Sequence, residues 1–211
     1  HIDPSEVGND RHILISELSG ASNVFLKLVE MGLHYDKSAP EVKEIRGELE
    51  RLEQAGYEFE AADASFQLLI QKTLKQHRSF FTLEIFRAIS EKRDAYGKTI
   101  AEASVKIDVN GESEYTVAEG DGPVDALDQA LRKALTRFFP VLAEVILTDY
   151  RVRILDPEEH TAAKTRVLVE STDGVDTWST VGVSENIIEA SLEALIDSME
   201  FKLLLEEKKN A

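Results

Sequence analysis

The residues best placed to do chemistry lie in the segment Gly120-Asp121-Gly122-Pro123, directly before a predicted helix that carries Asp125. The N–H groups in the first turn of a helix have no intrahelical partner, so they attract an anion such as a carboxylate. Asp125 would then hold an ammonium group beside that anion. The loop Val183-Ser184-Glu185-Asn186 also begins a predicted helix. Two such helix starts close together would form a cradle for a small zwitterion.

The same segment also has a purely structural interpretation. Asp121 would cap the helix, and Pro123 would occupy its first turn, where a missing N–H breaks no hydrogen bond. The sequence contains neither a phosphate-binding glycine loop nor a His-Glu-x-x-His motif. We therefore expect no metal site in this chain.

A second polar group stands at the beginning of the sequence. His1, Asp3 and Asn9 lie within nine residues, and Gly8 permits a close turn between them. A terminal histidine beside aspartate and asparagine is usually part of an ordinary loop, so these residue types alone do not predict catalysis. The opening residues include no initiator methionine, and we expect the chain to be part of a longer protein.

The elements that would position these loops occur twice. Residues 99–139 and 163–204 each read as strand, tight turn, strand, loop and helix. The turns Asn110-Gly111 and Asp173-Gly174 are residue pairs that tolerate the positive φ of a hairpin. A shift of 64 positions aligns Thr116 with Thr180, Val117 with Val181, Ala126 with Ala190, and Leu131 with Leu195. We expect two β-β-β-α units stacked about a pseudo-twofold axis, an arrangement that suits ligand sensing and dimerisation.

Three helices are predicted before this repeat, at residues 21–33, 41–55 and 62–76. Ser38 followed by Pro40 is typical of a capped helix start. The expected fold is therefore α+β, with a small helical subdomain before the duplicated β-β-β-α domain. The predicted boundaries are a linker at 1–20, the helical subdomain at 21–78, and the duplicated domain at 79–211, with repeats at 79–140 and 143–205. Residues 206–211 are expected to fray.

The composition excludes several classes of function. The formal net charge is −16, from 40 acidic and 24 basic residues. Nucleic acids and anionic membranes are bound by clustered Lys and Arg, so we expect neither as a partner. The absence of cysteine excludes disulfides and thiolate chemistry and fits a reducing cytoplasm. No apolar run approaches the roughly 18 residues that a membrane span requires.

Several segments resemble the 2-isopropylmalate synthase and citramalate synthase family, and within it the citramalate synthase subgroup most. They are His1-Ile2-Asp3-Pro4, Val7-Gly8-Asn9, Ser16-Glu17-Leu18-Ser19-Gly20-Ala21-Ser22-Asn23, Gly56-Tyr57-Glu58-Phe59-Glu60-Ala61-Ala62-Asp63-Ala64-Ser65-Phe66, Glu119-Gly120-Asp121-Gly122-Pro123-Val124-Asp125-Ala126, Leu147-Thr148-Asp149-Tyr150, Ala162-Ala163-Lys164 and Val181-Gly182-Val183-Ser184. Together they extend over nearly the whole chain.

The resemblance implies an acyltransferase whose TIM barrel precedes this chain. That barrel would hold a divalent metal and condense acetyl-CoA with a 2-oxo acid, which is pyruvate for a citramalate synthase. Residues 1–20 would be the linker over the partner's barrel, with His1, Asp3 and Asn9 taking part in catalysis. The family often has a tyrosine where this chain has Arg11, so the chain departs from the family pattern at this position. The chain alone would need no cofactor and would be inactive.

The resemblance also implies that the duplicated domain forms a homodimer and binds the end-product amino acid of the pathway as a feedback inhibitor. That effector is isoleucine for citramalate synthases and leucine for isopropylmalate synthases. The effector-binding residues are then Val124, Asp125, Leu147, Tyr150, Ile154, Ser184, Asn186 and Ile187.

Two questions about this assignment stay open. In a regular strand Leu147 points away from Tyr150 and Ile154, unless a bulge intervenes. The alternatives to an isoleucine sensor are a leucine sensor, a dimerisation module without effector binding, and a free-standing amino-acid-binding protein.

Overall fold

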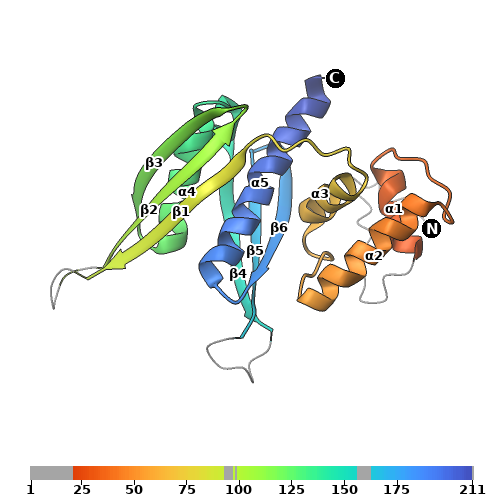
Figure 1. Cartoon of the computed structure of the whole chain (residues 1–211), viewed down its shortest axis with the longest axis horizontal. Helices are drawn as coiled ribbons and strands as arrows, with labels where there is room; N and C mark the ends of the chain where they lie inside the picture. Colours follow the sequence, from red (N-terminus) through yellow and green to blue (C-terminus); the bar gives the residue numbers. More distant parts are fainter. Residues whose placement is uncertain (1–20, 93–96, 98, 156–162, 211) are drawn as a thin grey trace.

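The computed structural model describes residues 21–92, 97, 99–155 and 163–210, and Figure 1 shows their arrangement. Within this part a layer of three helices precedes two three-stranded antiparallel sheets, each followed by a helix. The predicted α+β class is confirmed. The element order is compatible with the predicted repeat, whereas the pseudo-twofold axis stays a prediction.

The helical layer consists of α1 (Ala21–Glu30), α2 (Pro40–Ala55) and α3 (Asp63–Thr73). All three helices were predicted, although α1 and α3 each end three residues before the predicted boundary. Ser38 does not cap α2, because its N–H and hydroxyl both bind Asp36 Oδ1 and the residue before the helix is Ala39. Pro40 begins the helix as expected.

The first sheet pairs β1 (Thr82–Glu91), β2 (Ile100–Val109) and β3 (Glu112–Gly120) in that order, and the second pairs β4 (Ile146–Ile154), β5 (Thr165–Thr172) and β6 (Thr177–Ser184). The predicted hairpin turns lie between the second and third strands of each sheet. Asn110, Gly111 and Gly174 have φ angles of 53°, 88° and 86°. These left-handed values explain the residue types of the turns.

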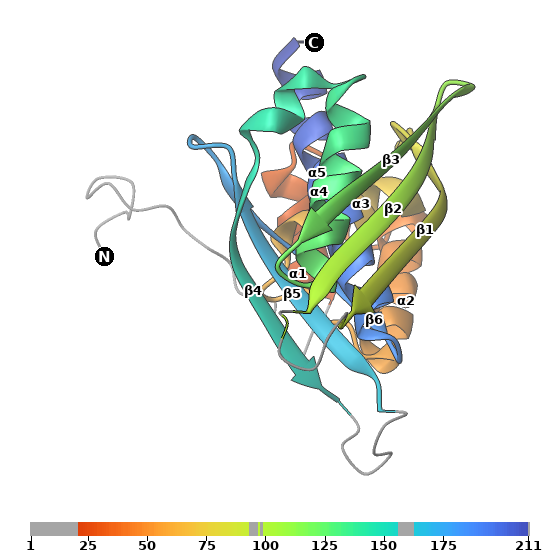
Figure 2. The ribbon, with the colours of Figure 1, turned by 90° about the vertical axis from the view of Figure 1, so that its left-hand side faces the viewer.

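The helices that follow the sheets are α4 (Pro123–Thr136) and α5 (Ile187–Asn210), which contact each other and lie next to each other in Figure 2. Leu127, Leu131 and Leu135 of α4 are completely buried, as the helical spacing predicts. One core cluster joins these residues to both sheets. A short 3₁₀ helix (Pro140–Glu144) connects α4 to β4. Residues 206–210, which were expected to fray, continue α5.

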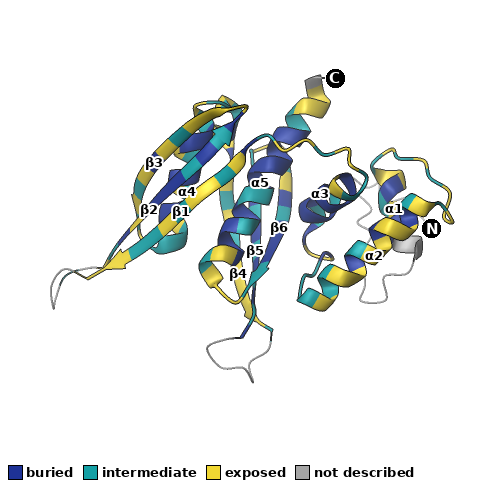
Figure 3. Ribbon diagram, viewed as in Figure 1, coloured by how far each residue is buried: buried dark blue, intermediate teal, exposed yellow. Residues whose placement is uncertain are grey.

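The two sheets differ in what covers their outer faces. The helical layer covers the outer face of β4–β6, because Val181, Leu168 and Val183 pack against its core. The outer face of β1–β3 is uncovered in the described structure and exposes 59% of Tyr115 and 40% of Val117 (Figure 3). The separate core of the helical layer therefore includes residues of the second sheet, whereas Ala64 and Leu68 of α3 belong to the cluster that joins both sheets.

Candidate functional site

A cavity of about 510 Å³, here called the α4–β4 cavity, opens between the start of α4 and the first half of β4. This volume is in the usual range for small-molecule pockets. Four of the eight predicted effector residues line it, and the described lining is Val124, Asp125, Asp128, Arg132, Val145, Ile146, Leu147 and Tyr150. The cavity thus combines an apolar wall with charged groups of both signs.

A β-bulge brings Leu147 and Tyr150 to the same face of β4. Leu147 pairs with Ser171 and Tyr150 with Val169, and Thr148 is the extra residue between them. Since Ser171 and Val169 lie two residues apart on β5, their partners point the same way. Because of the bulge, Leu147 can contribute to the same site as Tyr150. The first sheet has the same irregularity between Leu83 and Ile85, 64 positions earlier.

Arg132 of α4 connects this helix to the segment that leads into β4, along the side of the cavity. Arg132 Nη2 lies 2.8 Å from Asp128 Oδ1, and Arg132 Nη1 donates to the carbonyl oxygens of Val145 at 2.5 Å and Leu142 at 3.2 Å. Burial raises the pKa of Asp128, and the adjacent Arg132 opposes this shift. Because Arg132 satisfies these groups, its primary role is to hold the entrance to β4 in place.

Asp125 is oriented by the backbone that leads into α4. Its Oδ2 accepts a hydrogen bond from the Asp121 N–H at 2.8 Å. A Cβ on Gly120 would lie 2.7 Å from the same oxygen and 2.4 Å from the Ala126 nitrogen, so this close approach requires glycine. The residue before the helix is Gly122 rather than Asp121, so the predicted Asp121 cap is wrong. Pro123 is in the first turn, as expected.

Tyr150 connects the α4–β4 cavity to α5. Its hydroxyl lies 2.7 Å from Ser191 Oγ, and Ser191 Oγ in turn donates to the Ile187 carbonyl at 2.6 Å. Both groups belong to the beginning of α5. A ligand that displaced Tyr150 would therefore disturb this part of α5.

The other predicted effector residues lie outside the α4–β4 cavity. Ile154 and Ile187 are 58% and 42% exposed. Ser184 and Asn186 line a separate cavity of about 550 Å³ beside Lys164. They also shape the start of α5, because Asn186 Oδ1 accepts the Ile188 N–H and Ser184 donates to Glu189. Their role as effector contacts stays a prediction.

The predicted catalytic residues His1, Asp3 and Asn9 lie outside the described residues. Sequence reasoning had also missed Asp128 and Arg132. Their spacing of four residues on α4 was the available signal, since it allows an ion pair on one helix face.

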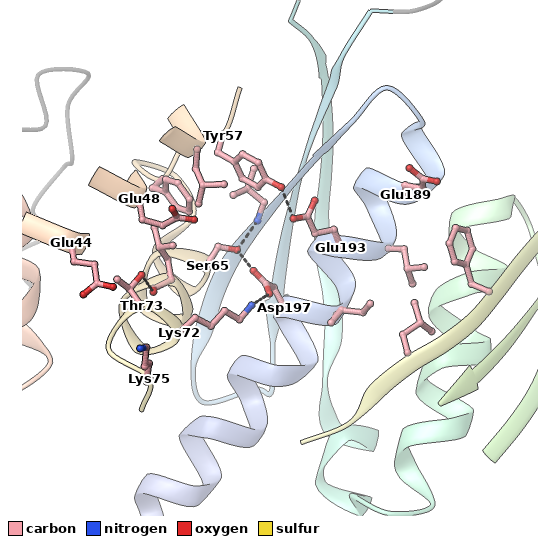
Figure 4. Close-up of a pocket in the computed structure, with 18 residues that line it drawn as sticks. Glu44, Glu48, Tyr57, Ser65, Lys72, Thr73, Lys75, Glu189, Glu193 and Asp197 are labelled. Carbon is pink, nitrogen blue, oxygen red and sulfur yellow. Dashed lines mark hydrogen bonds and ion pairs between the residues drawn. The ribbon is translucent and has the colours of Figure 1, made fainter. Parts of the chain in front are cut away.

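A larger cavity, of about 790 Å³, lies where the helical layer meets α5 and β1; it is called the seam cavity here. Figure 4 shows its polar lining, with Tyr57 and Ser65 of the helical side pointing toward Glu193 and Asp197 of α5. Apolar side chains from all three parts complete the lining: Leu52, Phe59, Leu69, Leu83, Phe86, Val181, Leu192 and Ile196. Sequence reasoning had not predicted this cavity, because its walls come from distant segments.

Three carboxylates on one side of α5 hold the helical layer and its connector. Glu193 Oε1 accepts the Tyr57 hydroxyl at 2.5 Å. Asp197 accepts Ser65 Oγ at 2.8 Å and Lys72 Nζ at 3.0 Å. Glu200 lies at the connector after α3, where Oε1 accepts Ser79 Oγ and the Phe80 N–H, and Oε2 lies 3.1 Å from His77 Nε2. The positions 193, 197 and 200 follow helical spacing, so they form one acidic stripe.

Residues 60–203 match the family model described as the LeuA allosteric (dimerisation) domain. The chain belongs to this family. The matched region begins just before α3 and extends into α5, so it includes both sheets, the α4–β4 cavity and the acidic stripe. Helices α1 and α2 precede the matched LeuA-domain region.

Curated relatives of this LeuA-domain chain include an (R)-citramalate synthase of Geobacter sulfurreducens, 49% identical over 96% of the chain. The (R)-citramalate synthase of Aquifex aeolicus is 47% identical over 99% of the chain. A 2-isopropylmalate synthase of Aquifex aeolicus is 28% identical over 94% of the chain. The chain spans only 38%, 39% and 35% of the length of these three relatives.

Within the described ranges, no helix of the LeuA-domain chain combines the length and the apolar composition that a membrane span needs.

The acidic stripe makes the stability of the LeuA-domain chain depend on pH. Burial raises the pKa of Glu193 above its ordinary value of 4.5, although the Tyr57 hydroxyl opposes the shift. The folded state therefore binds this proton more tightly, and stability falls as the pH rises from about 4.5 through the folded pKa. Glu193→Gln abolishes the titration and can keep both contacts, because its oxygen can accept the Val183 N–H and its amide nitrogen can donate to the Tyr57 hydroxyl. As the pH rises through this range, the free energy of unfolding should fall less in the variant than in the parent. Urea unfolding measures both.

Glu185→Gln on the exposed loop before α5 controls for the loss of one negative charge. It should keep the pH dependence of the parent. Identical slopes for the parent and Glu193→Gln would contradict the assignment of this titration to Glu193.

Proposed function

We propose that this chain is the regulatory part of an enzyme of the citramalate synthase type, and that isoleucine binds in its α4–β4 cavity as a feedback inhibitor. The observation that carries the proposal is this cavity, in which apolar side chains and charged groups of both signs meet at the start of α4. The family match and the names of the relatives support the choice of enzyme.

The cavity offers a partner for each part of an amino acid. The N–H groups of Val124 and Asp125 are in the first turn of α4, where they have no intrahelical acceptor and attract a carboxylate. The Asp125 side chain lies beside them and provides the negative charge for the ammonium group. Leu147 and the ring of Tyr150 provide the surface for a branched aliphatic side chain.

The proposed inhibition passes along α5 to the helical layer. The hydrogen bonds from Tyr150 to Ser191 and from Ser191 to Ile187 connect the cavity to the beginning of α5. The acidic stripe connects α5 to the helical layer through Tyr57 and Asp197. Isoleucine would shift this equilibrium only by binding two states of the chain with different affinity.

The whole enzyme, in this proposal, is a cytoplasmic homodimer that condenses acetyl-CoA with pyruvate. Catalysis would reside in the part of the relatives' length that this chain does not span, and the chain alone would be inactive. His1, Asp3 and Asn9 would assist that reaction by resemblance only. The exposed apolar residues Val152 and Ile154 of β4 are suited to burial between two copies.

Isothermal titration calorimetry of the chain with isoleucine, leucine and valine tests the proposal. We expect saturable binding of isoleucine, and at least about fivefold weaker binding by Tyr150→Ala, because loss of an aromatic ring at the centre of a binding contact costs about 1 kcal/mol or more. The matched control is Tyr115→Ala on the uncovered face of the first sheet, where the ring is 59% exposed. This control should bind isoleucine like the parent.

The other outcomes decide between the alternatives. A preference for leucine would favour an isopropylmalate synthase type, since the two side chains differ only in their branching. Failure of a folded, dimeric chain to bind any of the three amino acids would contradict the sensor proposal and favour a dimerisation module.

A further inference from the structure

The seam cavity and the α4–β4 cavity are formed by corresponding elements of the two β-β-β-α units. Each cavity lies between the beginning of one long helix and the first strand of the other β-β-β-α unit. Leu83 and Phe86 of β1 precede Leu147 and Tyr150 of β4 by 64 positions, and both pairs line their cavities. Glu189 of α5 corresponds in the same way to the acidic residue at the start of α4.

Two differences between the units change the chemistry of the seam cavity. Asp128 and Arg132 of α4 are replaced by Leu192 and Ile196 of α5. The Asp128–Arg132 pair and the hydrogen bonds from Arg132 to the segment before β4 therefore have no counterpart at these two positions, where the α5 wall is apolar. The helical layer adds a further wall, which includes the buried Phe59.

The charges in the seam cavity favour a cationic ligand. Its described lining contains the carboxylates Glu44, Glu48, Glu189, Glu193 and Asp197, and the cations Lys72 and Lys75. Lys72 is already paired with Asp197 at 3.0 Å. Each oxygen of Glu193 accepts one hydrogen bond, from Tyr57 or the Val183 N–H, and a carboxylate oxygen can accept more than one. An incoming cation would find acceptors there, whereas an anion would be repelled.

We propose that the seam cavity is a second ligand site, which takes a small protonated amine with a branched aliphatic body. The ammonium group is held by Glu193 and Glu189 of α5, which are labelled in Figure 4. The aliphatic body lies against Leu83, Phe86 and Ile196. The site goes beyond the isoleucine site proposed at α4 and does not depend on it. Because its walls belong to the helical layer, α5 and β1, an occupant bridges the seam between the layers.

The probes are 2-methylbutylamine and 3-methylpentanoate, which pair similar branched bodies with opposite charges. Titration of the chain is followed by calorimetry and by amide NMR shifts. We expect saturable binding of the amine, shifts in α5 around residues 189–196, and no binding of the acid. Glu193→Gln should weaken amine binding about tenfold, because a charged hydrogen-bond partner becomes neutral. The Gln oxygen can accept the Val183 N–H while its amide nitrogen donates to the Tyr57 hydroxyl, so both contacts have a replacement and the cavity should keep its shape.

Matched cavity-filling variants identify the binding location. Ile196→Trp should abolish amine binding, and Val124→Trp, which fills the α4–β4 cavity, should leave it unchanged. If circular dichroism shows that Ile196→Trp is unfolded, Leu83→Trp takes its place, because it fills the seam cavity from β1. The proposal is overturned if the amine does not bind, if the acid binds as well as the amine, or if binding persists in the folded seam variants. Isoleucine binding should be lost in Val124→Trp and kept in the seam variants. The two proposals can therefore fail independently, and the variants show which one has failed.

Discussion

Replacing Lys202 with methionine should lower the free energy of unfolding by about 3 kcal/mol, because it leaves the Asp173 carboxylate covered and unpaired. Lys202 Nζ lies 2.7 Å from Asp173 Oδ2 and 2.7 Å from Glu206 Oε1. The side chains of Lys202 and Asp173 are only 2% and 3% exposed. The expected loss is at the lower end for buried pairs, because the turn that carries Asp173 is at the end of the second sheet.

The pH dependence of this pair supplies a second readout. Burial acts to raise the pKa of Asp173, but the Lys202 ammonium and the N–H groups of Asp176 and Val175 together lower it below its ordinary value of 3.8. The folded state therefore binds this proton less tightly than the unfolded chain, and the pair's contribution is lost as the pH falls below about 3.8. Lys202→Met should reduce this acid-dependent loss of stability.

Lys209→Met is the matched control for Lys202→Met. Lys209 is also on α5 and also pairs with a residue of the same turn, Asp176, at 3.2 Å. Its side chain is 49% exposed, so the pair should contribute no more than about 1 kcal/mol. Urea unfolding monitored by circular dichroism measures both variants. Equal losses in the two would show that burial does not set the strength of the Lys202 pair.

Gly182→Ala should be comparably damaging, with a loss of about 3 kcal/mol, because β6 approaches the backbone of α5 too closely to accept a side chain. A Cβ at this position would lie 2.1 Å from the Ala190 carbonyl oxygen and 3.0 Å from the Ala194 nitrogen. Both neighbours are backbone atoms of one helix, so neither can rotate away. Relief requires β6 and α5 to separate, which opens the core around Val181 and Trp178.

Gly47→Ala is the control, since it makes the same chemical change without a steric conflict. Gly47 is exposed within α2, and a Cβ there would meet no atom within 4 Å. Alanine is favoured over glycine in a helix by about 1 kcal/mol, so this variant should be more stable than the parent. The midpoint of urea unfolding gives the sign for each variant. A Gly182→Ala protein as stable as the parent would mean that the two elements are not packed this closely.

The Gly182 contact could not be predicted from the sequence, although the sequence predicted both elements that meet there. The period of apolar residues predicted α5, and the alternation together with the Asp173-Gly174 turn predicted β6. Neither pattern contains the distance between the two backbones. The Lys202 pair is similar, because its partner is 29 positions away and belongs to a different element.

The candidate site divides in the same way. Asp125 was predicted from the sequence because it follows a helix-start signal, and Val124 was predicted from the family resemblance of its segment. Leu147 was doubtful until the extra residue at Thr148 was located in the pairing of β4 with β5. Arg132 acquires its role only through the carbonyl groups of Leu142 and Val145, beyond the end of its own helix.

The sequence by itself determined the helices, the strands, the hairpin turns and the repeated order, because these depend on residue periods and on backbone conformations within a few positions. The tertiary structure decided which sheet the helical layer covers, where the bulges turn a side chain over, and that a cavity forms at the seam. These features depend on contacts between residues far apart in the chain. Their free energy comes from burial and pairing in three dimensions, which no local pattern of residues contains.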